Sequence, residues 1–307
     1  MGQANTSGDL GAAYAHCLAL ARSHYENFPT ASGILLGKKL AAPVAAIYAF
    51  SRTADDFADE PGEGTKEERL AKLAKWEKHL EAALAGKPDH PVFLALADTA
   101  KNYKLPIDLF RALLSAFKQD VAKSRYETPA EMLDYCTRSA NPVGRLVLRL
   151  HGYDDPALDA RSDAICTALQ LANFWQDVAI DLEKDRIYLP QSEMKRFGVT
   201  EENLRAGKAD ESYKKLLSQE CARARALFEE GAALPSMVRG RLALWLRCVW
   251  LGGTKILAGV EKAGYDVFRK RPALSTFDKI SILFKALAGW VFHRPALPAA
   301  APPRTAP

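Results

Sequence analysis

Two segments of the chain carry acidic residues at spacings that would place them in a row along a helix. In the first segment, residues 43–60, the row consists of Tyr48, Arg52, Asp55 and Asp59, at relative positions 0, 4, 7 and 11. At about 100° per residue, these side chains share one narrow face of an otherwise apolar helix. Two carboxylates in line with an arginine are suited to binding a metal ion together with an anion.

The second segment, residues 163–190, repeats this arrangement. Its row consists of Gln170, Asn173, Asp177 and Asp181, at relative positions 0, 3, 7 and 11. The residues between them are mostly apolar, which predicts a helix buried on most sides, where unpaired carboxylates are costly and repel each other. A solvated helix face would explain one such row. Two rows in two apolar helices instead favour rows that face each other across a cavity and bind divalent cations.

The donor atoms indicate which cation and which ligand such a cavity would hold. Oxygen donors without nearby His or Cys favour Mg²⁺ over zinc, and Mg²⁺ readily shares its coordination shell with a diphosphate. Metal ions can make diphosphate a leaving group by neutralising the charge that develops on it. An apolar lining would hold an isoprenoid chain, and aromatic faces in it would stabilise a carbocation. Six aromatic residues in or near the two segments are candidates for this lining, although each alone is more typical of a core: Tyr48, Phe50, Phe57, Tyr135, Phe174 and Trp175.

Helices are the elements that must position these rows. Ala, Leu, Lys, Glu and Arg dominate the chain, and Pro or Gly clusters separate the periodic stretches. The expected helices cover about 10–25, 42–58, 66–85, 91–101, 106–121, 129–137, 140–151, 160–183, 209–232, 236–261 and 277–291. We therefore expect an all-α fold, a single-domain helical bundle with a central cavity. This domain would span residues 10–294, between a flexible N-terminus (1–9) and a disordered Pro/Ala tail (295–307).

Composition excludes several other classes of protein. Of the 307 residues, 48% are hydrophobic and 26% are charged, which is ordinary for a folded protein, and the net charge of +5 is too small to indicate nucleic acid as a partner. The five cysteines are scattered, which argues against disulfides or a structural zinc site. Because we find neither a secretory signal nor an apolar run of about 18 residues, we expect a cytoplasmic protein.

Residues 277–294 combine a strongly apolar stripe with lysines, and two interpretations remain open. The segment could be a last helix packed on the core. Alternatively, it could be an interfacial helix that rests on the inner membrane, where isoprenoid substrates dissolve.

The two acidic segments resemble the aspartate-rich motifs of the squalene/phytoene synthase family. Residues 46–60 resemble the first motif and residues 169–190 the second, and the resemblance extends from about Ala15 to Arg271. It implies an all-α enzyme that uses Mg²⁺ to process farnesyl or geranylgeranyl diphosphates, or their cyclopropyl intermediates. Residues 22–32, 135–148 and 173–190 resemble most closely the branch of bacterial hydroxysqualene synthases.

The resemblance also implies roles for particular residues. It matches four residues to the metal-binding acids: Asp55, Asp59, Asp177 and Asp181. It matches four others to positions near the diphosphate: Tyr48, Arg52, Gln170 and Asn173. Ser23, Tyr135 and Tyr265 match further cavity positions. Arg186 either reaches a phosphate or is a surface arginine at a helix end.

Two departures from the family pattern bear on the reaction. Gln176 stands where many members have Arg, and residues 139–144 (SANPVG) replace a run of small residues. We expect Asn141 or Gln176 to help position a water molecule that quenches the carbocation.

The resemblance implies that presqualene diphosphate is ionised, rearranged and trapped by water as hydroxysqualene. A presqualene diphosphate synthase would supply the substrate, and a reductase would make squalene from the product for hopanoid synthesis. Two alternatives stay open: a squalene or phytoene synthase that condenses two prenyl diphosphates, and a non-catalytic helical protein that carries lipid at the membrane surface.

Overall fold

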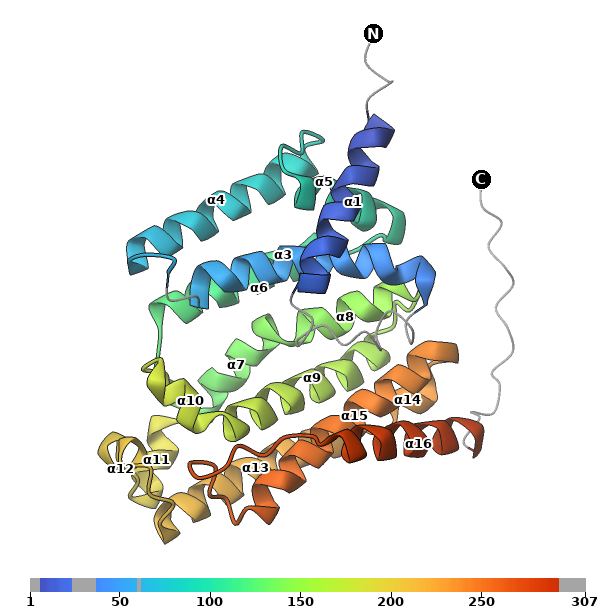
Figure 1. Cartoon of the computed structure of the whole chain (residues 1–307). Helices are drawn as coiled ribbons and strands as arrows, with labels where there is room; N and C mark the ends of the chain where they lie inside the picture. Colours follow the sequence, from blue (N-terminus) through green and yellow to red (C-terminus); the bar gives the residue numbers. More distant parts are fainter. Residues whose placement is uncertain (1–5, 24–36, 60–61, 293–307) are drawn as a thin grey trace.

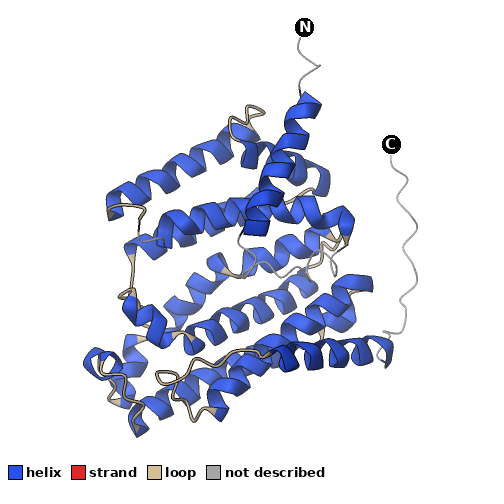
Figure 2. Cartoon of the chain, in the orientation of Figure 1, coloured by secondary structure: helices blue, strands red, loops and turns tan. Residues whose placement is uncertain are grey.

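Helices make up nearly all regular structure in the computed structural model, which describes residues 6–23, 37–59 and 62–292 (Figure 2). Within these ranges there is no β-strand, and an isolated bridge joins Arg125 to Ile187. The prediction of a single all-α domain is confirmed. Residues 1–5 of the expected flexible N-terminus and the expected tail 295–307 lie outside the described residues, whereas residues 6–9 belong to the first helix.

The first half of the chain forms one layer of the bundle (Figure 1). Its helices are α1 (Thr6–Ser23), the 3₁₀ turn η1 (Lys38–Leu40), α3 (Ala41–Asp59), α4 (Lys66–Leu84), α5 (Pro91–Tyr103) and α6 (Ile107–Ala122). The other half contains α7 (Pro129–Ser139), α8 (Asn141–Leu150), α9 (Pro156–Gln176), α10 (Val178–Glu183), α11 (Gln191–Phe197), α12 (Glu201–Arg205), α13 (Glu211–Gly231), α14 (Leu234–Met237), α15 (Gly240–Lys262) and α16 (Thr276–Phe292).

Every helix that periodicity predicts is present, with ends shifted by a few residues. The largest difference is that the expected helix 160–183 begins at Pro156 and is divided at Asp177 into α9 and α10. Periodicity also missed η1, α11, α12 and α14, because elements of three to seven residues are too short to show it.

Helix α9 lies at the centre of the second half, packed against α8, α13 and α15. Two glycines permit this close packing. A Cβ at Gly144 of α8 would lie 2.3 Å from Oγ of Ser162, and a Cβ at Gly231 of α13 would lie 2.3 Å from Cγ1 of Ile165. The second acidic row is therefore carried by a helix that neighbouring backbones hold closely in place.

Within the described residues, α15 is the helix that is long and apolar enough to cross a membrane. However, it packs against α9, α13, α14 and α16, and Leu242, Leu246 and Leu257 are buried in the bundle. These contacts attach the buried side of α15 to the bundle.

Glu220 on α13 is a fully buried carboxylate that the acidic rows do not include. In the described structure neither of its oxygens accepts a hydrogen bond, and Nε of Arg223 lies 3.4 Å from Oε2. Burial raises the pKa of Glu220 to about 7, opposed by Arg223 and reinforced by Glu193. The folded protein therefore binds this proton more tightly than the unfolded chain. The resulting stability is present below pH 4.5 and is lost as the pH rises through about 7.

Replacing Glu220 with Gln removes this charge and keeps the size of the side chain. We expect the free energy of unfolding to match wild type near pH 4.5 and to exceed it by about 1–3 kcal/mol at pH 8. Urea unfolding at both pH values measures the difference, with Glu229→Gln, an exposed change on the same helix, as the control. An effect of equal size at both pH values would show that Glu220 does not titrate in this window.

Candidate active site

The first acidic row lies on the C-terminal half of α3. Two side chains of α4 donate hydrogen bonds to backbone carbonyls of α3. Nη1 of Arg69 donates to the carbonyl of Ala58 at 2.7 Å, and Nε1 of Trp76 donates to the carbonyl of Phe50 at 3.2 Å. Phe50 is fully buried, so the apolar side of α3 faces the core and its acidic row faces the opposite way.

Arg52 lies between two carboxylates of its own helix. Its guanidinium is 3.2 Å from Oδ2 of Asp55 and 2.5 Å from Oδ1 of Asp56. Burial raises the pKa of Asp55 to about 6, and the charge of Asp59 adds to this effect while Arg52 opposes it. Burial also raises the pKa of the neighbouring Tyr48, with Arg52 acting in the opposite direction. The predicted row therefore exists and concentrates negative charge.

The second row continues across the division between α9 and α10. Asp177 leaves helical geometry (φ −107°, ψ 13°), yet its N–H still donates to Asn173 and its carbonyl still accepts from the N–H of Asp181, both at 2.9 Å. The backbone hydrogen bonds therefore continue across Asp177, and the side-chain amide of Asn173 donates to Oδ2 of Asp177 at 2.6 Å. Gln170 is half-buried one turn earlier.

Arg186 binds the first row and lies within electrostatic range of Asp181 in the second. Its guanidinium forms a two-point contact with Asp59, at 2.8 and 2.6 Å, and Nζ of Lys184 lies 3.8 Å from the same carboxylate. The segment that carries Arg186 is held beside residues 124–126, where the N–H of Ile187 donates to the carbonyl of Ser124. With its side chain only 12% exposed, Arg186 is an interior arginine, which excludes the surface interpretation left open by the sequence.

Asp120 is a further acid of this site that the sequence did not reveal. Its carboxylate accepts a hydrogen bond from the hydroxyl of Tyr135 at 2.9 Å, which places Tyr135 beside this acid. Burial raises the pKa of Asp120 to about 7, and the charges of Asp59 and Asp55 contribute to the increase. Asp120 is hard to find in the sequence because it ends an ordinary amphipathic helix and belongs to neither row.

Asp181 completes the negative cluster. Burial raises its pKa to about 7, Asp177 and Asp59 increase it further, and Arg186 opposes the shift. Since carboxylates of both rows act on each other's pKa, the rows lie within electrostatic range of each other and of Arg186.

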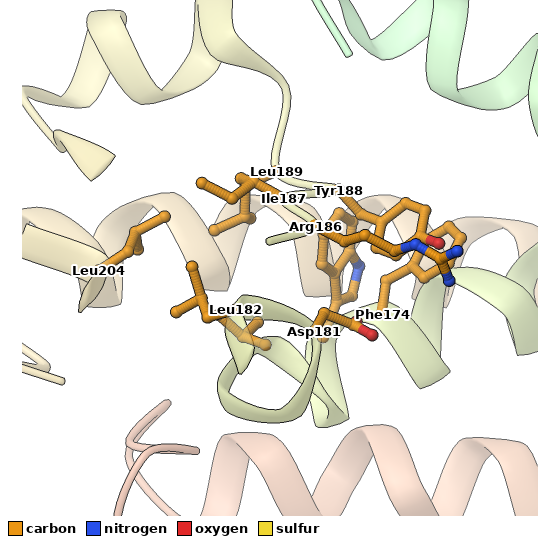
Figure 3. Close-up of a pocket in the computed structure, with 10 residues that line it drawn as sticks. Phe174, Asp181, Leu182, Arg186, Ile187, Tyr188, Leu189 and Leu204 are labelled. Carbon is orange, nitrogen blue, oxygen red and sulfur yellow. The ribbon is translucent and has the colours of Figure 1, made fainter. Parts of the chain in front are cut away.

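An aromatic wall adjoins these charges. The rings of Phe174 and Tyr188 stack in parallel with centroids 3.7 Å apart, and Tyr126 and Tyr135 pack around Tyr188. Figure 3 shows a small pocket here, with Asp181, Arg186, Tyr188 and Phe174 near one end. Leu182, Leu189 and Leu204 lie toward its other end. The site thus joins a charged end to an aromatic and aliphatic surface.

Apart from Tyr48 of the first row, the aromatic candidates divide into two groups. Tyr135, Phe174 and Trp175 belong to the core cluster beside the site. In contrast, Phe50 and Phe57 pack against Trp76 on the far side of α3 and act as core residues.

The segment between α15 and α16, residues 263–275, is called the strap here, and it is fastened to the second row. Nε and Nη2 of Arg271 bind Oδ1 and Oδ2 of Asp177 at 2.5 and 3.0 Å. The buried amide of Gln176 donates to the carbonyl of Pro272. The sequence missed this contact because nearly one hundred residues separate its two sides.

Three predicted residues lie apart from the charged cluster or have other partners. Ser23 is exposed at the end of α1, where its hydroxyl donates to the carbonyl of Leu20 at 2.9 Å. Tyr265 lines an outer groove with Lys214 and Lys215 instead of the pocket beside Asp181. Asn141 is buried at the start of α8 and accepts a hydrogen bond from Thr167 at 2.9 Å.

The donor set of the two rows fits a hard divalent cation. It offers carboxylate oxygens, and burial raises the pKa of Asp55 and Asp181, a cost that a bound cation would remove. In residues 6–23, 37–59 and 62–292, however, no three His, Cys, Asp or Glu side chains converge as a metal centre would require. Arginines contact the acids instead, with Arg186 on Asp59 and Arg271 on Asp177.

Comparison with known proteins gives a consistent result. The squalene/phytoene synthase family profile matches residues 10–278. A phytoene synthase of Thermus thermophilus is 33% identical over 270 residues, covering 88% of this chain and 90% of that protein. A phytoene synthase of Arthrospira platensis is 33% identical over 255 residues, covering 78% and 81% of the two chains.

Solved structures agree with the sequence comparison. The squalene synthase HpnC of Alicyclobacillus acidocaldarius superposes with a TM-score of 0.78 at 39% identity, covering 85% of this chain and 99% of that one. A dehydrosqualene synthase in complex with ligand superposes with a TM-score of 0.80 at 26% identity, covering 92% and 98%. The chain is therefore a member of the squalene/phytoene synthase family of isoprenoid synthases.

Proposed function

We propose that this enzyme ionises and rearranges presqualene diphosphate and traps the product with water, giving hydroxysqualene and diphosphate. The observation that carries the proposal is the approach of acids from both rows, Asp59 and Asp181, to Arg186 next to the stacked rings of Phe174 and Tyr188. This arrangement offers one end to a diphosphate and the other to a hydrocarbon. The 39% identity to a protein described as a squalene synthase supports a squalene-forming route.

We assign the metal sites to Asp55 and Asp59 on one side and to Asp177 and Asp181 on the other. Mg²⁺ bound there would neutralise the charge that develops on the diphosphate as its bond to carbon breaks. Arg52 and Arg186 supply fixed positive charges beside the same oxygens, with the amides of Gln170 and Asn173 nearby.

The reaction balances without a redox partner. The carbon–oxygen bond breaks with its electron pair leaving on diphosphate, and the cyclopropyl cation rearranges. Water then adds through its oxygen and loses a proton, for which the departing diphosphate is a suitable acceptor. We assign the stabilisation of the cation to the aromatic cluster of Tyr188, Phe174 and Tyr135 beside the charged end.

Separate supply of the candidate substrates tests the proposal. We expect presqualene diphosphate to give hydroxysqualene and diphosphate in the presence of Mg²⁺, with no effect of NADPH. Farnesyl or geranylgeranyl diphosphate alone should give no coupled product. A presqualene diphosphate synthase would then precede this enzyme and a squalene-forming reductase would follow it.

A synthase that condenses two prenyl diphosphates is the second candidate, favoured by the relatives named phytoene synthase at 33% identity. Phytoene formed from geranylgeranyl diphosphate, or squalene formed from farnesyl diphosphate with NADPH, would establish this function instead. If no substrate releases diphosphate in a Mg²⁺-dependent way, the non-catalytic lipid carrier is the remaining interpretation.

Asn141 and Gln176 are our candidates for positioning the quenching water. The hydrogen bond from Gln176 to Pro272 gives this residue a second role in holding the strap. We expect Asn141→Ala or Gln176→Ala to shift the product from hydroxysqualene toward rearranged or eliminated hydrocarbons, measured by gas chromatography of the products. An unchanged hydroxysqualene yield in both variants would remove both residues from this role.

A further inference from the structure

Helix α16 presents an unusually apolar face to solvent. Phe277, Ile280, Leu283, Phe284 and Leu287 are 78%, 50%, 42%, 69% and 36% exposed. At about 100° per residue, these five side chains fall within one sector of about 120°. Single exposed apolar residues are common, but five on one helix face form a patch that indicates a binding surface.

The opposite side of α16 is packed against the bundle. Ala286 is fully buried, and a Cβ at Gly289 would lie 3.4 Å from Nε of Arg247 on α15. Lys255 of α15 lies 3.2 Å from Asp278, which also caps the start of α16 through Ser275. The helix therefore has a fixed orientation along the outside of α15 (Figure 1), and its apolar face points away from the core.

Positive charge borders this face. Lys279 and Lys285 are exposed on the two sides of the apolar sector, about 40° and about 80° beyond its edges. Just before the helix, Arg269 and Lys270 are also exposed. Over residues 269–292 the sequence has five basic residues and one acidic residue, Asp278, which is paired with Lys255. An apolar helix face with a basic border complements an anionic lipid surface.

The position of α16 in the chain connects this face to the acidic rows. Arg271, which binds Asp177, is six residues before Phe277, so the two backbone positions are at most about 20 Å apart. The strap between them is packed against the bundle, because Val267 is buried and Phe268 packs on Tyr213 of α13. A surface bound to α16 would therefore lie near the second acidic row.

We propose that the apolar face of α16 docks on an anionic lipid bilayer, holding the acidic rows close to the surface in which an isoprenoid diphosphate is dissolved. Docking inserts Phe277, Ile280 and Phe284 among the acyl chains, while Lys279 and Lys285 contact the lipid phosphates. This inference deepens the proposed function and rests on it for the identity of the lipid substrate. The docking itself depends only on the surface of α16.

Vesicle flotation of the full chain tests the docking. We expect wild type to float with vesicles of phosphatidylglycerol and phosphatidylcholine, and to float less with phosphatidylcholine alone. The double variant Phe277→Glu/Phe284→Glu should bind at least tenfold more weakly, and Lys279→Gln/Lys285→Gln should lose the preference for phosphatidylglycerol. A matched control, Leu84→Glu/Met237→Glu, changes two exposed apolar residues on other helices and should float like wild type.

Further measurements separate the competing outcomes. Circular dichroism melting confirms that each variant is folded. Wild type that does not float, or floats equally well after the double glutamate change, overturns the proposal. A dimer in sedimentation that the glutamates convert to a monomer, without vesicle binding, would assign the face to a second copy of the chain. Activity on detergent-dispersed presqualene diphosphate should persist in the double glutamate variant, so failure of docking and failure of the proposed reaction are distinguishable.

Discussion

Replacing Asp59 with Asn is expected to slow the release of diphosphate from presqualene diphosphate by about 10³-fold. Asparagine keeps the size of the side chain but removes the negative charge that we assign to metal binding. It also removes the two-point partner of Arg186, whose guanidinium would then be drawn toward Asp120 or Asp181. Steady-state release of diphosphate at saturating Mg²⁺ measures the loss.

A charge change elsewhere provides the control for Asp59→Asn. Asp163 pairs with Arg145 and lies on α9 about 20 Å along the helix from Asp177. Asp163→Asn removes the same charge, and we expect its rate to stay within about twofold of wild type. Equal losses in the two variants would mean that Asp59 acts through overall charge or folding instead of through the site.

Replacing Arg186 with Gln should separate its electrostatic role from its catalytic role. Without Mg²⁺, the variant removes the ion-pair partner of Asp59 and a positive charge that acts on Asp181, and we expect a loss of about 2–3 kcal/mol in the free energy of unfolding. With Mg²⁺, the acids gain a replacement charge, so Mg²⁺ should raise the melting temperature more in the variant than in wild type. Diphosphate release should still fall by about 100-fold, because Mg²⁺ does not replace the guanidinium at the diphosphate.

The matched control for Arg186→Gln is Arg149→Gln. Arg149 is 12% exposed, as Arg186 is, and pairs with Asp159 far from the acidic rows; Asp159 is 11% exposed, against 25% for Asp59. This variant should also have a lower free energy of unfolding than wild type, but Mg²⁺ should not raise its melting temperature more than that of wild type. If Mg²⁺ shifts the melting temperatures of both variants equally, Arg186 does not compete with a cation for the acids.

The parts of the site that could be predicted are those encoded by local periodicity. Helical spacing alone placed Asp55 with Asp59 and Asn173 with Asp177, and the long amphipathic stretches gave the helices that carry them. Spacing also predicted one continuous helix through Asp177, where the backbone in fact departs from helical geometry. A single residue with altered φ and ψ leaves no trace in a hydrophobic pattern.

The parts that could not be predicted depend on contacts between distant segments. Asp120 is an ordinary acid at the end of α6 until the 186–189 segment folds beside residues 124–126 and brings Arg186 and Tyr188 to it. Arg271 likewise gains its role from the strap, whose path along α13 and α15 no local motif specifies. The role of such residues can be recognised only when the three-dimensional structure shows which distant residues they contact.

Anomalous diffraction from crystals soaked with Mn²⁺ and a non-ionisable thio analogue of presqualene diphosphate tests the central claim most directly. The two acidic rows should hold Mn²⁺, with anomalous peaks beside Asp55 or Asp59 and beside Asp177 or Asp181, and the guanidinium of Arg186 should have moved from Asp59 to the diphosphate. Peaks elsewhere, or no peaks with Arg186 still bound to Asp59, would contradict the account.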